Sequence, residues 1–176
     1  MTVLERKRSH PRRRLAVAIA CAGLAAGLLA TSFIALAQDQ SAATVKDVIF
    51  ARKTMMDSIS DNMDQIEMMI STGKIDVADA HEHADTMSVM LMAFPHLFPP
   101  ASNQWKANNP DPDPVADTFA SPDVWSKFSD FYKRAADASK TAFDISRADK
   151  VDDLKTRAKE LRVACNACHD LYLKTQ

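Results

Sequence analysis

Two cysteines and a histidine near the end of the chain have a spacing that can hold an iron porphyrin. Cys165, Cys168 and His169 form the pattern Cys-x-x-Cys-His, through which haem is attached covalently to proteins. Residues three apart on a helix lie on one face, with Cβ atoms about 5–6 Å apart, so both thiols can reach the two vinyl groups of one porphyrin. The adjacent histidine can then place a ring nitrogen on an axial position of the iron. The motif predicts one covalently attached haem c per chain, with His169 as an iron ligand.

Zinc sites and redox dithiols use the same residue types and are the alternatives to haem. A closed zinc site needs further cysteine or histidine ligands, and the chain has no second cysteine pair. A redox dithiol typically lies where a strand leads into a helix, whereas this pair falls late in a long helical stretch. The sequence therefore favours haem over both alternatives.

The first 37 residues have the features of an export signal. A segment with six basic residues is followed by a mostly apolar stretch over residues 15–36, and Ala35-Leu36-Ala37 fits the small-x-small cleavage pattern. A retained transmembrane anchor is the alternative, because the apolar stretch is long enough to span a bilayer. We expect cleavage, which would leave residues 38–176 in the periplasm without a stable membrane anchor.

Residues 38–176 have the length and charge of one compact acidic domain. These 139 residues can bury a single core. They contain 16 Lys and Arg against 22 Asp and Glu, a net charge of −6. This charge argues against a nucleic-acid partner and favours periplasmic redox proteins with basic patches. No recognisable motif pairs a nucleophile with a base, so we expect a carrier rather than an enzyme.

Hydrophobic periodicity predicts four helices. Core-type residues recur at alternating spacings of three and four. They do so over residues 45–70, 77–94, 124–145 and 151–172. Gly73 ends the first helix, Asp76 caps the second and Ser121 begins the third, while the proline-rich residues 95–121 form a long connection. The fold class that follows is all-α: an antiparallel four-helix bundle with one long loop between helices 2 and 3.

Arg52 occupies a position of the first helix that the periodicity assigns to the core. A buried arginine requires an anionic partner, and the propionates of a haem would supply one through charge-assisted hydrogen bonds. The alternative is an arginine whose aliphatic stem lies along the core while its head reaches water. We favour the contact with a propionate.

The exported part resembles the class II c-type cytochromes, the cytochrome c prime family. The resemblance is carried by residues 165–172 at the haem-binding end of the last helix, residues 48–56 in the first helix, residues 97–100 in the long loop and Val124-Trp125. It implies a four-helix bundle, a haem propionate near Arg52, and a homodimer formed through the first helices, as in many relatives.

The resemblance also implies a role for Met56, four residues after Arg52. In the family this position faces the distal side of the iron, where low-spin members have a methionine ligand and high-spin members leave the iron five-coordinate. Met55 and Met63 compete with Met56 for the role. A His169/Met56 haem would transfer single electrons between periplasmic redox partners. An open distal site would instead bind nitric oxide or carbon monoxide.

Leu173 departs from the family pattern, which commonly has a basic residue directly after the position of Tyr172. A leucine there could shield His169 from solvent, or it could be an exposed residue at the end of the helix. The sequence leaves both alternatives open.

Overall fold

The computed structural model describes residues 23–111, 113 and 117–174, with side chains from Thr44 onward. The chain divides into two compact units, Met1–Ala42 and Ala43–Gln176. Residues 1–22 of the predicted export signal lie outside the described residues, so its cleavage and the periplasmic location stay predictions. Among the helices described, none carries an apolar run sufficient to cross a membrane.

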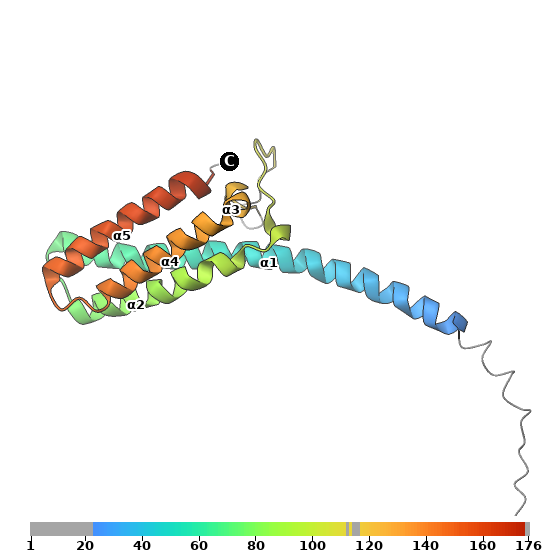
Figure 1. Cartoon of the computed structure of the whole chain (residues 1–176), viewed down its shortest axis with the longest axis horizontal. Coiled ribbons are helices and arrows are strands. Elements are labelled where there is room, and N and C mark those ends of the chain that lie inside the picture. The colour runs from blue at the N-terminus through green and yellow to red at the C-terminus, as the bar shows by residue number, and fades with distance from the viewer. Residues whose placement is uncertain (1–22, 112, 114–116, 175–176) are drawn as a thin grey trace, which may run out of the picture. The chain divides into compact units, whose positions relative to one another are not determined.

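The second unit is a bundle of helices (Figure 1). In chain order the elements are α1 (Gly23–Thr72), α2 (Val77–Ala93), the 3₁₀ turns η1 (Phe94–Leu97) and η2 (Pro100–Ser102), α3 (Asp123–Ser126), α4 (Phe128–Ile145) and α5 (Val151–Tyr172). The residues described include no strand, only an isolated antiparallel bridge between Ala120 and Leu173. The predicted all-α four-helix bundle is confirmed, with α1, α2, α4 and α5 as its helices.

The short link between α1 and α2 has the local structure that its residues predict. Gly73 takes a φ of +71°, a left-handed conformation that ends a helix and favours glycine. Three residues later, the Asp76 carboxylate accepts hydrogen bonds from the backbone N–H groups of Ala78 (3.0 Å) and Asp79 (3.2 Å). Asp76 thus caps α2, as expected.

The predicted continuous third helix is wrong, because the chain breaks at Lys127 between α3 and α4. Lys127 has φ −120° and ψ 34°, outside the helical region. Ser121 does begin the segment, since its hydroxyl accepts a hydrogen bond from the Asp123 N–H (3.2 Å). The Trp125 indole N–H reaches back to the carbonyls of Phe98 (3.1 Å) and Pro99 (3.2 Å). These contacts hold α3 against the long loop, and the helix breaks directly after α3.

The buried side chains form two core clusters at different heights of the bundle. The larger is centred on residues such as Met63, Ile66, Met87, Ala142 and Leu161. The smaller consists of Phe94, Phe98, Val124, Phe131 and Tyr172. Met55 and Met56 pack against both clusters, while Cys165 packs against the larger and Cys168 against the smaller. The predicted haem motif therefore lies where the two cores meet.

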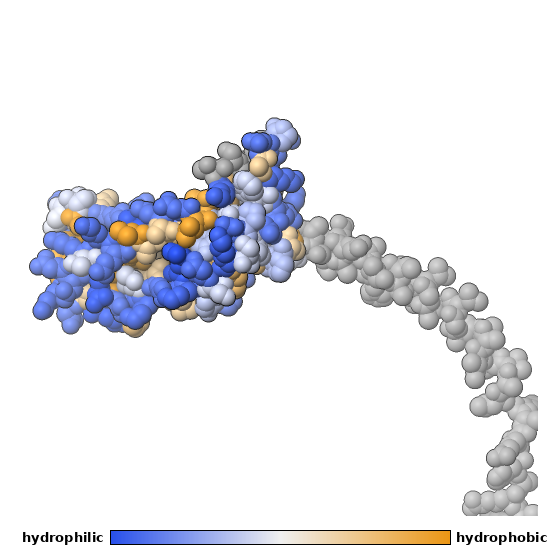
Figure 2. Space-filling view, turned by 45° about the horizontal axis from the view of Figure 1, so that its top comes forward, coloured by the Kyte–Doolittle hydropathy of each residue, from blue (hydrophilic) through white to orange (hydrophobic). Residues whose placement is uncertain are grey.

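The outer surface of the bundle is mostly hydrophilic, and Figure 2 shows a strip of apolar residues among charged ones on the face in view. Ion pairs between residues four apart stabilise the outside of α4. They include Lys133–Asp137 (2.5 Å) and Lys140–Asp144 (2.7 Å). Such exposed pairs contribute only a few tenths of a kcal/mol each, so packing of the two cores carries most of the stability.

We predict that Gly73→Ala lowers the free energy of unfolding by about 1 kcal/mol, because an L-residue resists the left-handed conformation. A Cβ atom at this position would meet nothing within 4 Å, so the loss would come from the backbone alone. Urea unfolding followed by circular dichroism measures it. Lys74→Ala, at the exposed neighbouring position, is the matched control and should leave stability unchanged. Equal stability of Gly73→Ala and wild type would contradict the prediction.

Candidate haem site

A cavity of about 370 Å³ lies between the helices of the bundle. Its lining includes Arg52 and Met56 from α1, and Cys165, Cys168 and His169 from α5. The apolar part of the wall includes Ile59, Met63, Leu91, Phe94, Phe98, Val124 and Phe131. The structure thus brings together all five residues that the sequence nominated for the site.

Burial sets the protonation of the three motif residues on α5. Both cysteines are free and half-buried. Loss of solvent raises the pKa of the Cys165 thiol and raises the pKa of Cys168 to about 11. Burial, assisted by the positive charge of Arg162, lowers the pKa of His169. At neutral pH the motif therefore presents two neutral thiols and a neutral imidazole, the form of histidine that binds a metal.

These properties argue against the two alternatives for the motif. Reactive dithiols have lowered thiol pKa values, whereas both pKa values here are raised. A structural zinc site needs a cluster of ligands. No group of three or more His, Cys, Asp or Glu residues able to hold a metal ion occurs within the described part of the chain. Haem attachment remains the chemistry that the motif fits.

Arg52 is buried to 3% exposure, so the alternative in which its head reaches water is wrong. The guanidinium donates to the Ser102 hydroxyl (2.9 Å) and carbonyl (3.3 Å), and also to the Thr118 hydroxyl. It lies over the rings of Phe98 (4.6 Å to the centroid) and Trp125 (5.6 Å). These partners hold the long loop against α1.

The charge of Arg52 has neutral partners in these contacts. Burial lowers its pKa to about 10, so the side chain stays protonated at neutral pH. A buried cation is costly unless an anion compensates it. Because Arg52 also lines the cavity, an anionic group bound there can reach it. The contact with a propionate stays a prediction, and the structure provides the unmatched charge that it requires.

The three candidate methionines differ in their relation to the cavity. Met56 is half-buried and lines it, and so does Met63, which is buried to 2% exposure in the larger core. Met55 packs against both cores and is not part of the lining. Met56 lies one helical turn from Arg52 and shares the cavity with His169. This placement favours Met56 over Met55 as the methionine facing a bound haem.

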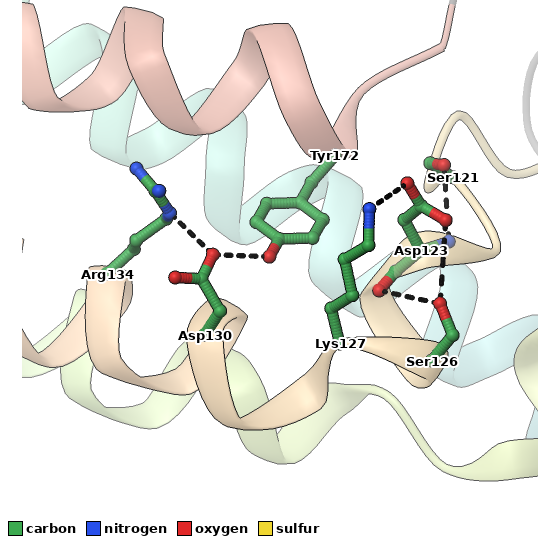
Figure 3. Close-up of polar contacts among 7 residues, drawn as sticks. All are labelled: Ser121, Asp123, Ser126, Lys127, Asp130, Arg134 and Tyr172. Carbon is green, nitrogen blue, oxygen red and sulfur yellow. Dashed lines mark hydrogen bonds and ion pairs between the residues drawn. The ribbon is translucent and has the colours of Figure 1, made fainter.

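A polar network fixes the end of α5 to α4 (Figure 3). The Tyr172 hydroxyl donates to the Asp130 carboxylate (2.6 Å), which also accepts from Arg134 Nε (2.7 Å). Burial and this hydrogen bond raise the pKa of Tyr172 to about 12. The hydrogen bonds from Tyr172 and Arg134 lower the pKa of Asp130. Tyr172 and Arg134 also line the cavity, so the network helps to fix its wall.

Leu173 combines features of both roles left open by the sequence. It is 47% exposed, yet it lines the cavity with His169. Its backbone forms the bridge with Ala120, supported by hydrogen bonds from Ser121 N to the Tyr172 carbonyl (2.8 Å) and from Lys174 N to the Phe119 carbonyl (2.8 Å). The end of α5 is therefore tied to the segment that precedes α3.

Four residues of the site have no signal in the sequence. Ser102 and Thr118 lie in the long connection, and Arg134 and Arg162 are spaced like ordinary exposed arginines of amphipathic helices. Their roles depend on which loop or helix lies opposite, and helix periodicity does not encode this. The predicted burial of Arg52 implied that its guanidinium needs partners, but it did not identify Ser102 or Thr118.

The residues present fit a covalently bound haem. Two free, half-buried thiols three residues apart face a cavity with an apolar wall. A neutral imidazole adjoins them, and the cavity contains a buried cation without an anionic partner among its described contacts. Each feature matches one part of the group: the vinyl carbons, the iron, the porphyrin face and a propionate.

Comparison with known proteins supports this fit. The family described as Cytochrome C′ matches residues 47–173 of the chain. No curated protein sequence matches this chain. The fold is similar to that of cytochrome c prime from Thermochromatium tepidum, with a TM-score of 0.65 and 18% sequence identity; the match covers 74% of this chain and 97% of that one.

Two further solved structures have the same fold. A cytochrome c prime described for a ligand-controlled dimer dissociation has a TM-score of 0.63 and 17% identity, covering 74% of this chain and 97% of the other. A nitric oxide complex of a cytochrome c prime variant from Alcaligenes xylosoxidans has a TM-score of 0.61 and 16% identity, with the same coverage.

We predict that replacing both motif cysteines, Cys165→Ala and Cys168→Ala, abolishes haem that survives denaturation, because no thioether can form. Haem staining of the protein after denaturing electrophoresis measures the covalent attachment. The control is Cys21→Ala, which lies outside the described residues in the predicted export signal and should keep the stain. Stained protein from the double variant would contradict the assignment.

The Tyr172–Asp130 hydrogen bond predicts an acid-dependent part of stability. Because the folded pKa of Asp130 is lowered, its contribution is present above the unfolded pKa of about 4 and is lost as pH falls through the folded value. Tyr172→Phe removes the largest cause of the shift and should reduce the loss between pH 5 and pH 3, measured from urea midpoints. Tyr132→Phe on α4 is the control. An unchanged pH dependence in Tyr172→Phe would refute the role of the hydrogen bond.

Proposed function

This chain belongs to the cytochrome c prime family and binds one haem c covalently, and from that premise we propose that it binds nitric oxide or carbon monoxide at the distal side of the haem. When bound, the haem supplies an iron centre with a coordination position for a diatomic ligand and a one-electron redox couple. In this proposal Cys165 and Cys168 would form the thioethers, His169 would ligate the iron and Arg52 would bind a propionate.

The apolar wall of the cavity that Met56 lines is the observation that carries the proposal. Ile59, Met63, Leu91 and Phe94 line the same cavity and have no hydrogen-bond donor in their side chains. The polarity and donors of a distal pocket decide which ligands a haem retains. An apolar wall suits carbon monoxide and nitric oxide, which bind iron without needing a hydrogen bond. The nitric oxide complex of the related protein from Alcaligenes xylosoxidans supports the same choice.

Electron transfer is the second candidate, and the position of Met56 favours it. Met56 lines the cavity with His169, so its thioether is available as a sixth ligand of a low-spin haem. A methionine ligand raises the reduction potential and suits electron transfer. In that case we propose periplasmic redox proteins with basic surfaces as partners, because the exported part has a net charge of −6.

The remaining parts of the proposal concern location, assembly and class. We propose a periplasmic location, based on the predicted export signal, and a carrier or ligand-binding role rather than an enzyme. We also propose that the protein forms a homodimer, which the ligand-controlled dimer dissociation named for the related cytochrome c prime supports.

The test is the absorption spectrum of the purified holoprotein. For gas binding we expect the broad bands of high-spin iron and a spectral change when carbon monoxide is added to the reduced protein. Met56→Ala should then keep the high-spin spectrum. Narrow, split low-spin bands that Met56→Ala converts to broad ones would support the electron carrier instead.

Met55→Ala is the matched control, since Met55 neighbours Met56 and does not line the cavity. It should leave either spectrum unchanged. A protein without covalent haem after denaturation would exclude both candidate functions.

A further inference from the structure

Arg162 joins the two helices that carry the opposite sides of the haem site. Its Nε donates to one oxygen of Glu67 (2.8 Å) and its Nη2 to the other oxygen (2.7 Å), with a further bond from Nη2 to Asp64 (2.9 Å). Arg162 lies on α5 one turn before Cys165, and both carboxylates lie on α1. A bidentate ion pair, a two-point pair between arginine and carboxylate, fixes the relative position of the two side chains more tightly than a single contact.

This ion-paired group lies at the rim of the cavity. Arg162 lines the cavity, and its side chain is 33% exposed to solvent. Its partners Glu67 and Asp64 do not line the cavity, so Arg162 lies between the cavity and the outer surface. Glu67 and Asp64 are more exposed, at 41% and 62%, and face the solvent side of the same contact.

The partners of Arg162 continue a line of residues along α1. Asp57, Ser60, Asp64 and Glu67 are spaced by three, four and three, which places them on one stripe of the helix. Asp57 and Ser60 are exposed and line the cavity, whereas Asp64 and Glu67 accept hydrogen bonds from Arg162. The cavity therefore opens between α1 and α5, and Arg162 bridges that opening at one end.

The bridge keeps its charge under ordinary conditions. The carboxylates raise the pKa of Arg162, so the side chain stays protonated. Met56, the residue facing the distal side in the proposed function, lies on α1, and His169 lies on α5. The separation of these two helices thus decides how wide the distal side is and how far Met56 stands from the proximal helix.

We propose that Arg162 is a positioning residue that holds α1 against α5 and limits how far the haem cavity opens. The inference rests on the proposed gas binding at this haem. By restraining α1, Arg162 slows entry of a diatomic ligand and keeps Met56 close to the haem-bearing helix. It does so without touching the ligand.

The experiment measures carbon monoxide association with the reduced holoprotein by flash photolysis. Arg162→Gln and Glu67→Gln should each raise the association rate about fivefold, since either change removes the two-point pair that restrains opening. Arg162→Lys should fall between them and wild type, because an ammonium keeps the charge and loses the two-point geometry.

Arg157→Gln is the matched control. Arg157 lies on the same helix and pairs with Asp144 on α4 (3.4 Å), away from the cavity lining. Its rate should equal that of wild type. Circular dichroism shows whether each variant is folded, and if Arg162→Gln is not, Glu67→Gln provides the test, because it keeps the contact between Arg162 and Asp64.

The outcomes separate this inference from the proposed function. A wild-type protein that binds carbon monoxide, with folded Arg162→Gln and Glu67→Gln variants that bind it at the wild-type rate, overturns the inference alone. A wild-type protein that binds no carbon monoxide overturns the proposed function. In that case the test is the absorption spectrum of the Met56-ligated haem. Arg162→Gln should shift this spectrum toward the high-spin form, and an unchanged spectrum would overturn the inference.

Discussion

The buried charge of Arg52 is the constraint on which the arrangement of the site depends. A cation at 3% exposure must be solvated by the protein, and the long connection supplies the dipoles through Ser102 and Thr118. The aromatic rings of Phe98 and Trp125 add their faces to the same charge. The proline-rich connection is thereby held against α1, and the charge of Arg52 lies in the wall of the cavity. The neutral dipoles compensate the charge of Arg52 only in part, and an anion bound in the cavity would complete the compensation.

The haem-binding motif lies between the two core clusters. Cys165 packs against the larger cluster and Cys168 against the smaller, so a group bonded to both sulfurs connects packing on both sides. In a domain of this size without a disulfide among its described residues, such a bond is both a functional and a structural link. The site and the core are therefore parts of one packing arrangement.

Helix periodicity was sufficient to predict the bundle and the core position of Arg52, stop and cap residues predicted the ends at Gly73 and Asp76, and the Cys-x-x-Cys-His motif predicted the haem-binding end of α5, because each depends on local sequence. Met56 was indicated by the resemblance to the cytochrome c prime family. The break at Lys127 has no signal in the helical periodicity. Directly before it, Trp125 hydrogen-bonds to Phe98 and Pro99, across a separation of more than 25 residues. The role of Arg162 was hidden for the same reason. The helical periodicity of α5 places Arg162 at an ordinary exposed position, and only the pairing of α5 with α1 gives it partners.

The two sides of the haem site are held by different kinds of interaction. On the proximal side one helix carries both cysteines and His169, and its end is fixed by the Tyr172–Asp130 hydrogen bond and by the bridge between Leu173 and Ala120. On the distal side α1 is held by packing, by Arg52 and by the rim contact of Arg162, without the covalent link to haem that the two cysteines give α5. Small changes on α1 can therefore alter the distance to a distal ligand while haem attachment stays intact. This separation makes the same motif on the last helix compatible with both proposed functions, a methionine-ligated haem and an open one.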